Sequence, residues 1–522
     1  MTTSVSDRSA TDLTRVARSG GLGLAGAVTA AAGGFALTVV VARSTSTTGA
    51  GLFFEAVALF TIASSVACLG ADTGLLRTLS RSSALGQLHD LRGTLVVALP
   101  PILFTSGIVT LLGLVWSDQL LGWLVGGSAT GEAAPYLQAV LAFLLIGTAY
   151  NVCVQATRGL GGVRPFVLLQ NVWLPFARLA CVVVAVQVLA TSALPWAWAL
   201  PLVPALAAAV LVLRRRLRAV ESGANAETPS RRPFRRLAAD FWSYSLLRGG
   251  AASIDITLVW LDVVLVGLLR STAEAGIYAA GSRYVTTGTL VVQAMRLATA
   301  PELSALLSTG QRERATRVYR TATSWIMLTS WPIYLLMASF PATLLGLFGD
   351  QYLPGSTALT VLSLAMLVSL ATGNVGTVLL MAGRSGSVLG NKAAALGLNV
   401  TLNLVLVPPF GMTGAALAWA AAIVVDNLLA VAQVSRLLET RSIDRAAMAT
   451  GAAACLCFGA LAVGGRLVLD DTLVALLATA LLGTALYAAA LRPFRDLLEL
   501  RELAALPRSL VTGRHTSPRS DS

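Results

Sequence analysis

Long apolar stretches recur along the whole chain. Each runs for about 20 residues, the length that an α-helix needs to cross the hydrocarbon core of a bilayer. The 522 residues contain fourteen of them. Their approximate ranges are 21–42, 50–71, 94–116, 136–156, 166–190, 194–213, 243–268, 275–299, 322–345, 357–382, 388–408, 412–435, 447–468 and 472–491. Because a backbone in lipid must satisfy its own hydrogen bonds, this pattern predicts an all-α, polytopic membrane protein.

The composition excludes the common soluble classes. Hydrophobic residues make up 56% of the chain and charged residues 12%, about half the usual charged share of a soluble domain. A soluble protein could not cover so much apolar surface with polar side chains. A soluble enzyme, a disordered chain and, despite the net charge of +13, a nucleic-acid-binding protein are therefore excluded. We expect the first apolar stretch to be a membrane span, because it is too long for a signal peptide.

The distribution of basic residues predicts the orientation. With the N-terminus placed inside, the inner segments hold 31 of the 38 basic residues, the outer loops hold three, and four lie within the stretches. Inner loops of membrane proteins are enriched in arginine and lysine. The asymmetry predicts an even number of spans and two cytoplasmic termini.

Short sequence matches indicate an internal repeat. Ala50-Gly51-Leu52-Phe53 opens the second stretch, and Ala275-Gly276-Ile277-Tyr278 opens the eighth, 225 residues later. Asn151-Val152 and Asn374-Val375 recur at an offset of 223 residues. Six spans per repeat is an even number, so the two repeats would share one orientation, related by an axis along the membrane normal.

The expected organisation has two pseudo-symmetric six-helix lobes and two additional helices. We call 21–213 the N-lobe and 241–435 the C-lobe. A cytoplasmic tail at 1–20, a basic linker at 214–240, two C-terminal spans within 436–491 and a basic tail at 492–522 complete the chain. The linker composition favours a flexible connection between the lobes. A second polar segment, 303–320, is expected to form a surface helix.

Charged residues within the stretches are the candidate functional residues. Each costs roughly 2.5–3.5 kcal/mol at the centre of a membrane helix, so each should face the bundle interior or a water-filled cavity. The candidates are Glu55, Arg178, Arg248, Asp255, Asp262, Arg283 and Asp426.

Three candidates share one face of the seventh stretch. Arg248, Asp255 and Asp262 are seven residues apart, which places them on one stripe about 21 Å long. Asp262 and Arg283 lie at similar depths in neighbouring stretches, so we expect them to pair. The pair would line a cavity for an anionic or polar substrate, or would be purely structural. Arg248 could instead extend to the cytoplasmic interface, and Glu55 to the outer one.

No motif for catalysis or metal binding occurs. The sequence contains no P-loop, no HExxH and no Cys/His spacing typical of a metal site. All five cysteines lie in apolar runs, where free cysteine acts as a small hydrophobic residue. We therefore expect no enzyme activity and no cofactor. Uphill transport would need an ion gradient, a partner or consumption of the product.

Four segments carry a resemblance to a known family. They are 49–81 (with TGAGLFFEAVALF and LGADTGLLRTLSR), 254–284 (with IDITLVWLDVVLVGLL and AEAGIYAAGSRY), Pro301-Glu302-Leu303, and 399–416 (NVTLNLVLVPPFGMTGAA). In their order and spacing, the chain resembles the polysaccharide and oligosaccharide flippases, which include the O-antigen and exopolysaccharide repeat-unit flippases. These belong to the multidrug/oligosaccharidyl-lipid/polysaccharide exporter (MOP) superfamily.

The resemblance implies two six-helix lobes around a central cavity and transport by alternating access. It implies flipping of polyprenyl-pyrophosphate-linked oligosaccharides across the bacterial cytoplasmic membrane. Asp262 and Arg283 stand where such proteins often carry an acidic and a basic residue, and arginine forms forked hydrogen bonds to phosphate oxygens. A polysaccharide polymerase and glycosyltransferases are expected partners.

Three other functions remain open. The chain could be an ion-coupled multidrug exporter of the same superfamily, a lipid-II-type flippase, or a non-transporting scaffold of a glycan-assembly complex. The arginine-rich inserts and the two additional spans argue against the drug exporter, which typically has twelve spans.

The orientation can be tested by cysteine labelling of intact cells. In a variant without native cysteines, an impermeant thiol reagent should label a cysteine at Gly127, in an expected outer loop, and should not label one at Gly223, in the linker. The reverse pattern would overturn the orientation.

Overall fold

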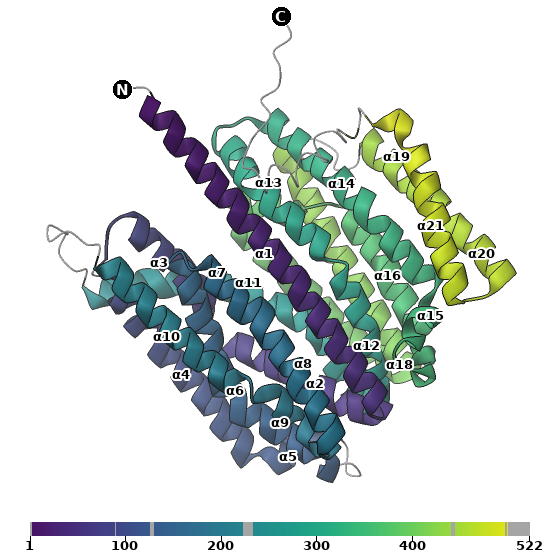
Figure 1. Cartoon of the computed structure of the whole chain (residues 1–522), viewed down its shortest axis with the longest axis horizontal. Coiled ribbons are helices and arrows are strands. Elements are labelled where there is room, and N and C mark those ends of the chain that lie inside the picture. Colours follow the sequence, from purple (N-terminus) through teal and green to yellow (C-terminus); the bar gives the residue numbers. More distant parts are fainter. Residues whose placement is uncertain are drawn as a thin grey trace, which may run out of the picture.

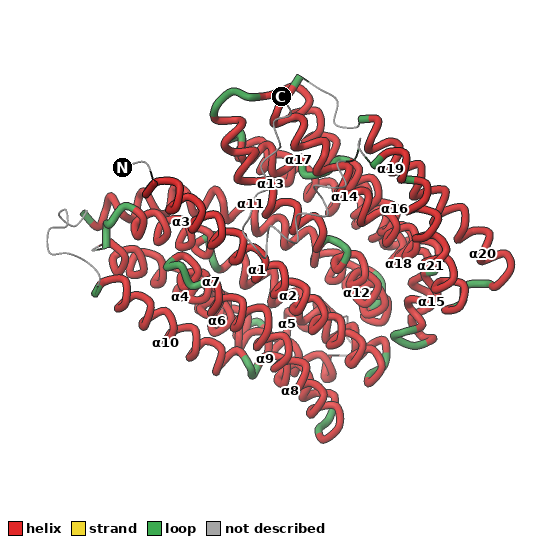
Figure 2. Tube along the Cα trace, turned by 45° about the horizontal axis from the view of Figure 1, so that its top comes forward, coloured by secondary structure: helices red, strands yellow, loops and turns green. Residues whose placement is uncertain are grey.

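The computed structural model describes residues 3–88, 90–125, 130–222, 233–439, 444–495 and 498. Within these ranges every regular element is helical and no strand occurs (Figure 2). The expected all-α class is therefore confirmed. The labelling positions Gly127 and Gly223 and most of the C-terminal tail lie outside the described residues.

The helices of the first half gather on one side of the molecule, and α1 runs along the boundary with the second half (Figure 1). They are α1 (Thr3–Ser44), α2 (Thr47–Ala67), α3 (Ala71–Ala84), α4 (Asp90–Val115), α5 (Ser117–Val125), α6 (Thr130–Gly159), α7 (Val163–Phe166), the π-helix η1 (Val167–Trp173), α8 (Leu174–Val188), η2 (Thr191–Ala193), α9 (Leu194–Ala199) and α10 (Leu202–Glu221). From Thr3, the expected N-terminal tail continues α1 as helix.

The second half forms the other side, with α19 to α21 at its outer edge (Figure 1). Its elements are α11 (Phe234–Leu269), α12 (Thr272–Thr287), α13 (Leu290–Ser308), α14 (Arg312–Ser339), α15 (Pro341–Gly346), η3 (Asp350–Gly355), α16 (Ser356–Ala371), α17 (Val375–Met381), α18 (Ser385–Leu438), α19 (Arg445–Ala454), η4 (Cys455–Ala460), α20 (Leu461–Leu469), α21 (Leu473–Ala490) and η5 (Arg492–Phe494). Helix α11 packs against both α18 and the first-half helices α2, α3 and α4.

The structure has fewer candidate membrane spans than the fourteen expected, when a span is defined by helix length and hydropathy. Eleven helices of the described part are long and apolar enough to cross a membrane, or up to twelve with the bent pair Thr272–Arg296 and Ala298–Ser308. This count takes α18 once and omits α14. At 54 residues α18 would be about 81 Å long if straight, but its backbone leaves helical geometry at Gly411 (φ 56°, ψ −139°). The number fourteen stays a prediction, as do the lobe boundaries.

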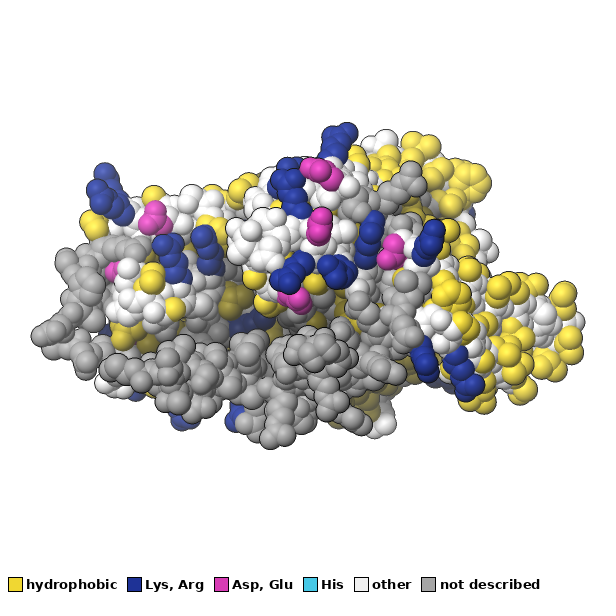
Figure 3. All heavy atoms as spheres, turned by 90° about the horizontal axis from the view of Figure 1, so that it is seen from above, with side chains coloured by type: hydrophobic (Ala, Val, Ile, Leu, Met, Phe, Trp, Pro, Cys, Tyr) yellow, Lys and Arg dark blue, Asp and Glu magenta, His cyan; other side chains and the backbone are white. Residues whose placement is uncertain are grey.

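Two expected polar segments are more helical than predicted. In the linker at 214–240, α10 continues to Glu221 and α11 begins at Phe234. In the segment 303–320 there is no separate surface helix, because α13 continues to Ser308 and α14 begins at Arg312. Arginine, leucine and alanine are strong helix formers, so the membrane helices extend beyond their apolar parts. Figure 3 shows basic side chains gathered on one end of the bundle and apolar ones on its C-terminal edge.

The two repeated segments each begin a helix that is capped by a serine side chain. The Ser46 hydroxyl accepts a hydrogen bond from the Gly49 amide at 3.1 Å, which caps α2. The Ser271 hydroxyl accepts one from the Glu274 amide at 3.2 Å, which caps α12. The two serines are 225 residues apart, the offset of the sequence repeat. The same local chemistry therefore begins the second helix of each expected lobe.

The two capped helices cross at their repeat-related glycines. A Cβ atom added at Gly276 would lie 2.7 Å from the Gly51 amide nitrogen, and one added at Gly51 would lie 1.8 Å from the Thr272 carbonyl oxygen. Neither helix could approach so closely with a larger residue at the crossing. Glycine therefore sets the distance between the halves at the expected outer end.

A second contact joins the halves at the other end of α2. A Cβ added at Gly249 of α11 would lie 2.1 Å from the Gly70 Cα atom, just before α3. The Arg77 guanidinium lies over the Tyr244 ring at 3.9 Å from its centroid. The halves therefore touch at both ends of α2 through small residues and one cation–π contact. Hydrogen bonds also join them, such as those from Ser253 to the Ser65 carbonyl at 3.2 Å and from Arg43 to the Leu347 carbonyl at 2.7 Å.

Substitution of Gly276 tests the crossing of α2 and α12. We expect Gly276→Ala to destabilise the folded protein by about 1–3 kcal/mol, because the added methyl overlaps the α2 backbone. Gly281→Ala on the same helix is the control, since its added Cβ meets nothing closer than a Leu345 methyl at 3.7 Å. The stability of both purified variants is measured by thermal unfolding. Equal midpoints for the two variants would contradict the crossing.

Candidate functional site

Asp262 is the centre of a buried polar cluster. The side chain is 1% exposed. Its carboxylate accepts hydrogen bonds from the Tyr278 hydroxyl at 3.0 Å, the Asn399 amide at 3.0 Å and the Asn403 amide at 2.9 Å. The expected ion pair of Asp262 with Arg283 is therefore wrong. Equal depth in the sequence does not determine which way two side chains point, and neutral donors from α12 and α18 satisfy this carboxylate instead.

Arg283 lies over an aromatic ring and forms no ion pair within the described part of the chain. Its guanidinium carbon is 3.9 Å from the centroid of the Trp260 ring on α11. A cation–π contact uses the face of the guanidinium and leaves its N–H donors free. The next residue, Tyr284, packs edge-on against Phe35 of α1 with ring centroids 5.1 Å apart. This part of α12 therefore lies at the boundary between the halves.

Asp255 and Asp426 share one cation. The Lys392 ammonium lies 2.6 Å from the Asp255 carboxylate and 3.3 Å from that of Asp426, which joins α11 to both arms of α18. Lys392 is the single lysine of the chain and is one of the 31 basic residues whose distribution predicts the orientation. Lys392 is absent from the sequence-based candidates, although its position inside the stretch 388–408 could have identified it as a further intramembrane charge.

Asp255 is the most exposed member of the Lys392 cluster. The Asp255 side chain is 51% exposed, whereas those of Lys392 and Asp426 are about one-fifth exposed. Arg296 of α13 lies within electrostatic range of both Arg248 and Asp255. Direct contacts in the cluster are those of Lys392 with the two carboxylates. Arg248 is only partly exposed, and its extension to the cytoplasmic interface stays an open alternative.

Glu55 does not reach the outer interface, contrary to the alternative considered for it. The residue is 7% exposed, and its carboxylate lies against the backbone of Gly267 on α11. Its Oε1 atom has no hydrogen-bond partner among the described residues. The close α2–α11 packing buries this carboxyl group.

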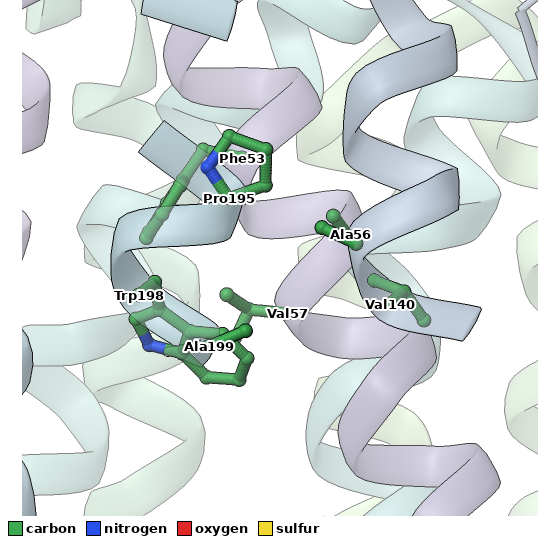
Figure 4. A pocket seen from close by; sticks show the side chains of 8 residues that line it. Phe53, Ala56, Val57, Val140, Pro195, Trp198 and Ala199 are labelled. Carbon is green, nitrogen blue, oxygen red and sulfur yellow. The ribbon is translucent and has the colours of Figure 1, made fainter. Parts of the chain in front are cut away.

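Arg178 lies within the first half of the chain and not at the boundary between the halves. Its guanidinium carbon is 3.8 Å from the centroid of the Trp198 ring, so the residue connects α8 to α9. Next to Trp198 is a small apolar pocket without charged lining residues (Figure 4). That pocket is lined by Phe53, Ala56, Val57, Ala139, Val140, Pro195, Trp198 and Ala199.

Metal-binding groups are absent from the described residues. No cluster of three or more His, Cys, Asp or Glu side chains there could hold a metal ion. The cysteines described are all free. The chemistry that the arrangement supports is binding of charged groups by arginine and lysine.

Removal of the Asp262 charge should destabilise the fold. In Asp262→Asn the new amide presents hydrogens toward donors, so at least one charge-assisted hydrogen bond is lost at a cost of roughly 2–4 kcal/mol. Asp255→Asn, at a half-exposed side chain, should cost less than about 1 kcal/mol. The stability of the two variants is compared by measuring their abundance in the membrane and the midpoint of thermal unfolding after purification. Similar stability of both variants would show that the Asp262 cluster is not structural.

No protein-family model matches the chain. Two curated proteins of Haloferax volcanii are similar to part of it. The probable low-salt glycan biosynthesis flippase Agl15 is 24% identical over 171 residues, which cover 33% of this chain and 36% of that protein. The probable flippase AglR is 25% identical over 186 residues, which cover 35% and 39%. The chain thus matches little more than a third of the length of these relatives.

Solved structures match nearly the whole fold. The lipid II flippase MurJ in an inward closed conformation aligns with a TM-score of 0.66 at 10% identity, over 90% of this chain and 98% of MurJ. The MATE multidrug transporter DinF-BH aligns with a TM-score of 0.58 at 18% identity, over 82% and 95%. An outward-facing MATE transporter of the MOP superfamily gives 0.57 at 16% identity, over 82% and 96%. All the proteins named are flippases or transporters and none is an enzyme. The chain therefore is a multi-pass membrane protein with the fold that MurJ and the MATE transporters of the MOP superfamily share.

Proposed function

We propose that the protein flips polyprenyl-pyrophosphate-linked oligosaccharide repeat units across the bacterial cytoplasmic membrane by alternating access. The repeat units would serve the biosynthesis of an exopolysaccharide or another surface glycan. The observation that carries the proposal is Arg283, an intramembrane arginine at the boundary between the halves with no acidic partner among the described residues.

The charges around the boundary favour an anionic ligand. The Lys392 ammonium partly neutralises the carboxylates of Asp255 and Asp426. The Asp262 carboxylate accepts hydrogen bonds from neutral side-chain amides. The guanidinium of Arg283 keeps its forked donors, which match the oxygens of a pyrophosphate. Among the described carboxylates at the boundary, Glu55 is buried by the α2–α11 contact and is not open to a cationic drug. The charge distribution therefore favours a glycan flippase over a multidrug exporter.

The contacts between the halves suit a transporter that changes conformation. The α2–α12 crossing consists of glycine against backbone, and the α3–α11 contact adds one arginine–tyrosine pair. Hydrogen bonds that cross the boundary, such as those from Ser253 to the Ser65 carbonyl and from Arg43 to the Leu347 carbonyl, involve partly buried or exposed groups, which can exchange partners when the halves separate. Separation at one end while the other stays closed would expose the boundary to each side of the membrane in turn.

The proposal also implies an orientation in the membrane and a set of partner enzymes. Both termini would lie in the cytoplasm, because the basic residues concentrate in the expected inner segments. Glycosyltransferases would supply the lipid-linked substrate on the inner leaflet, and a polysaccharide polymerase would consume it on the outer one. The partial likeness to two probable flippases, one of them of glycan biosynthesis, supports the substrate class.

Substitution of Arg283 tests the proposal. Arg283→Gln should leave abundance normal, because no ion pair is broken, and should reduce export roughly 10- to 100-fold by loss of a charge-assisted fork. Arg283→Lys, which keeps the charge without the fork, should retain intermediate activity. Arg215→Gln, at an exposed position of α10, is the control. The measurements are protein abundance, surface glycan and lipid-linked repeat units.

A deletion strain separates the alternatives. Loss of the protein should strand lipid-linked repeat units on the inner leaflet and remove a surface glycan. Unchanged glycans with new drug sensitivity would favour the multidrug exporter, and arrested peptidoglycan synthesis would favour a lipid-II-type flippase. Normal export by Arg283→Gln at normal abundance, with glycan loss in the deletion strain, would favour a scaffold.

A further inference from the structure

The short helix α15 is held at both ends by other parts of the chain. At its start, the Asp471 carboxylate accepts hydrogen bonds from the Ala342 amide at 3.1 Å, the Thr343 amide at 3.1 Å and the Thr343 hydroxyl at 2.6 Å. At its end, the Arg43 guanidinium donates to the Leu347 carbonyl at 2.7 Å. Asp471 lies in the turn between α20 and α21, and Arg43 lies in the last turn of α1. Helix α15 therefore connects the C-terminal helices to the first half of the chain (Figure 1).

The two contacts use the backbone groups that α15 cannot satisfy by itself. The first amides and the last carbonyls of a helix have no partner within it. A carboxylate is favourable at the start and a guanidinium at the end, because the helix dipole is positive at its N-terminus. Helix α15 has only six residues, and so short a helix is not stable alone. The position of the carbonyl that Arg43 binds therefore depends on the Asp471 cap at the opposite end.

The segment 340–355, which contains α15, also holds the corner between α1 and α2. The Gln351 side-chain amide donates to the carbonyls of Ala42 and Thr45, each at 3.4 Å. The Tyr352 hydroxyl donates to the Ala42 carbonyl at 3.4 Å. These bonds fix the chain just before α2 begins, next to the α2–α12 crossing.

The contact of α1 with this segment crosses the boundary between the halves. Helix α1 packs closely on the first half, because a Cβ atom added at Gly26 would lie 2.6 Å from a Val167 methyl of η1. One added at Gly33 would lie 3.0 Å from the Pro175 Cβ atom of α8. The segment 340–355 belongs to the second half, where η3 packs on α12 and α16. Separation of the halves at this end must therefore break its bonds to α1.

We propose that the two C-terminal helices act through α15 to hold the expected outer end of the boundary closed. We call the bonds of Arg43, Gln351 and Tyr352 between α1 and the segment 340–355 the outer latch. Asp471 is a positioning residue for this latch, because its cap holds the carbonyls that Arg43 binds. Arg43 is exposed, so water can replace its bonds when the latch opens. The inference gives the helices beyond the two expected lobes a role in closure and does not depend on the transported substrate.

Cysteine accessibility in the purified full-length protein tests the latch. In a variant without native cysteines, Thr272→Cys places a thiol at the buried α2–α12 crossing, and Asp118→Cys places one at an exposed position of α5. Arg43→Gln should raise the labelling rate of Thr272→Cys by a polar thiol reagent roughly fivefold, the effect of one lost hydrogen bond on the open fraction. The rate at Asp118→Cys should stay the same. An unchanged rate at Thr272→Cys would overturn the latch.

The role of the C-terminal helices is tested by removing the cap of α15. Asp471→Ala should raise the labelling rate of Thr272→Cys at least as much as Arg43→Gln does. The double variant should label no faster than Asp471→Ala alone, because both changes break the same contact. Asp350→Ala removes an exposed carboxylate from the same segment and is the matched control, with no expected effect.

A milder variant covers the case in which Asp471→Ala does not fold. Thr343→Val removes only the hydroxyl donor to Asp471, so it should raise the labelling rate roughly twofold. This effect should vanish when Arg43→Gln is also present. An unchanged rate in the cap variant that folds, or effects that multiply when the two ends of α15 are changed together, would overturn the role of the C-terminal helices.

Discussion

The absence of water in the hydrocarbon core is the constraint on which the rest of this structure depends. Every polar group placed there must find its partner within the protein or in a ligand. Asp262 finds three neutral donors, and Lys392 finds two carboxylates. Within the described part of the chain, Arg178 and Arg283 each lie over the face of a tryptophan and have no acidic partner. The groups that remain unsatisfied are therefore those with capacity to bind something else.

The same constraint explains why glycine stands where the halves meet. No hydrophobic effect drives helices together in lipid, so close packing of small residues has to do it. Gly51 and Gly276 let two backbones touch, as Gly70 and Gly249 do at the other end. A few side-chain hydrogen bonds supplement these contacts, such as those from Ser253 to the Ser65 carbonyl and from Arg43 to the Leu347 carbonyl. Such an interface can open and reform, which alternating access requires.

The sequence predicted which charged residues belong to the site, but it did not predict which residues they contact. The rarity of charge within apolar stretches identified Asp262 and Arg283, because each charged residue in lipid is costly. It did not reveal that Asp262 bonds to Asn399 and Asn403 or that Arg283 stacks on Trp260. Amides and tryptophans occur in apolar stretches at small cost, so they give no comparable signal.

The sequence by itself determined the all-helical class, the membrane setting and the repeat, since hydropathy and the 225-residue offset depend only on the order of residues. Only the tertiary structure decided which helices end early, as α12 does at Thr287, and which charges meet, as Asp255 and Lys392 do. Those outcomes depend on the rotation of each helix about its axis and on contacts between segments more than a hundred residues apart. A local pattern specifies the face of a helix and does not specify what that face meets.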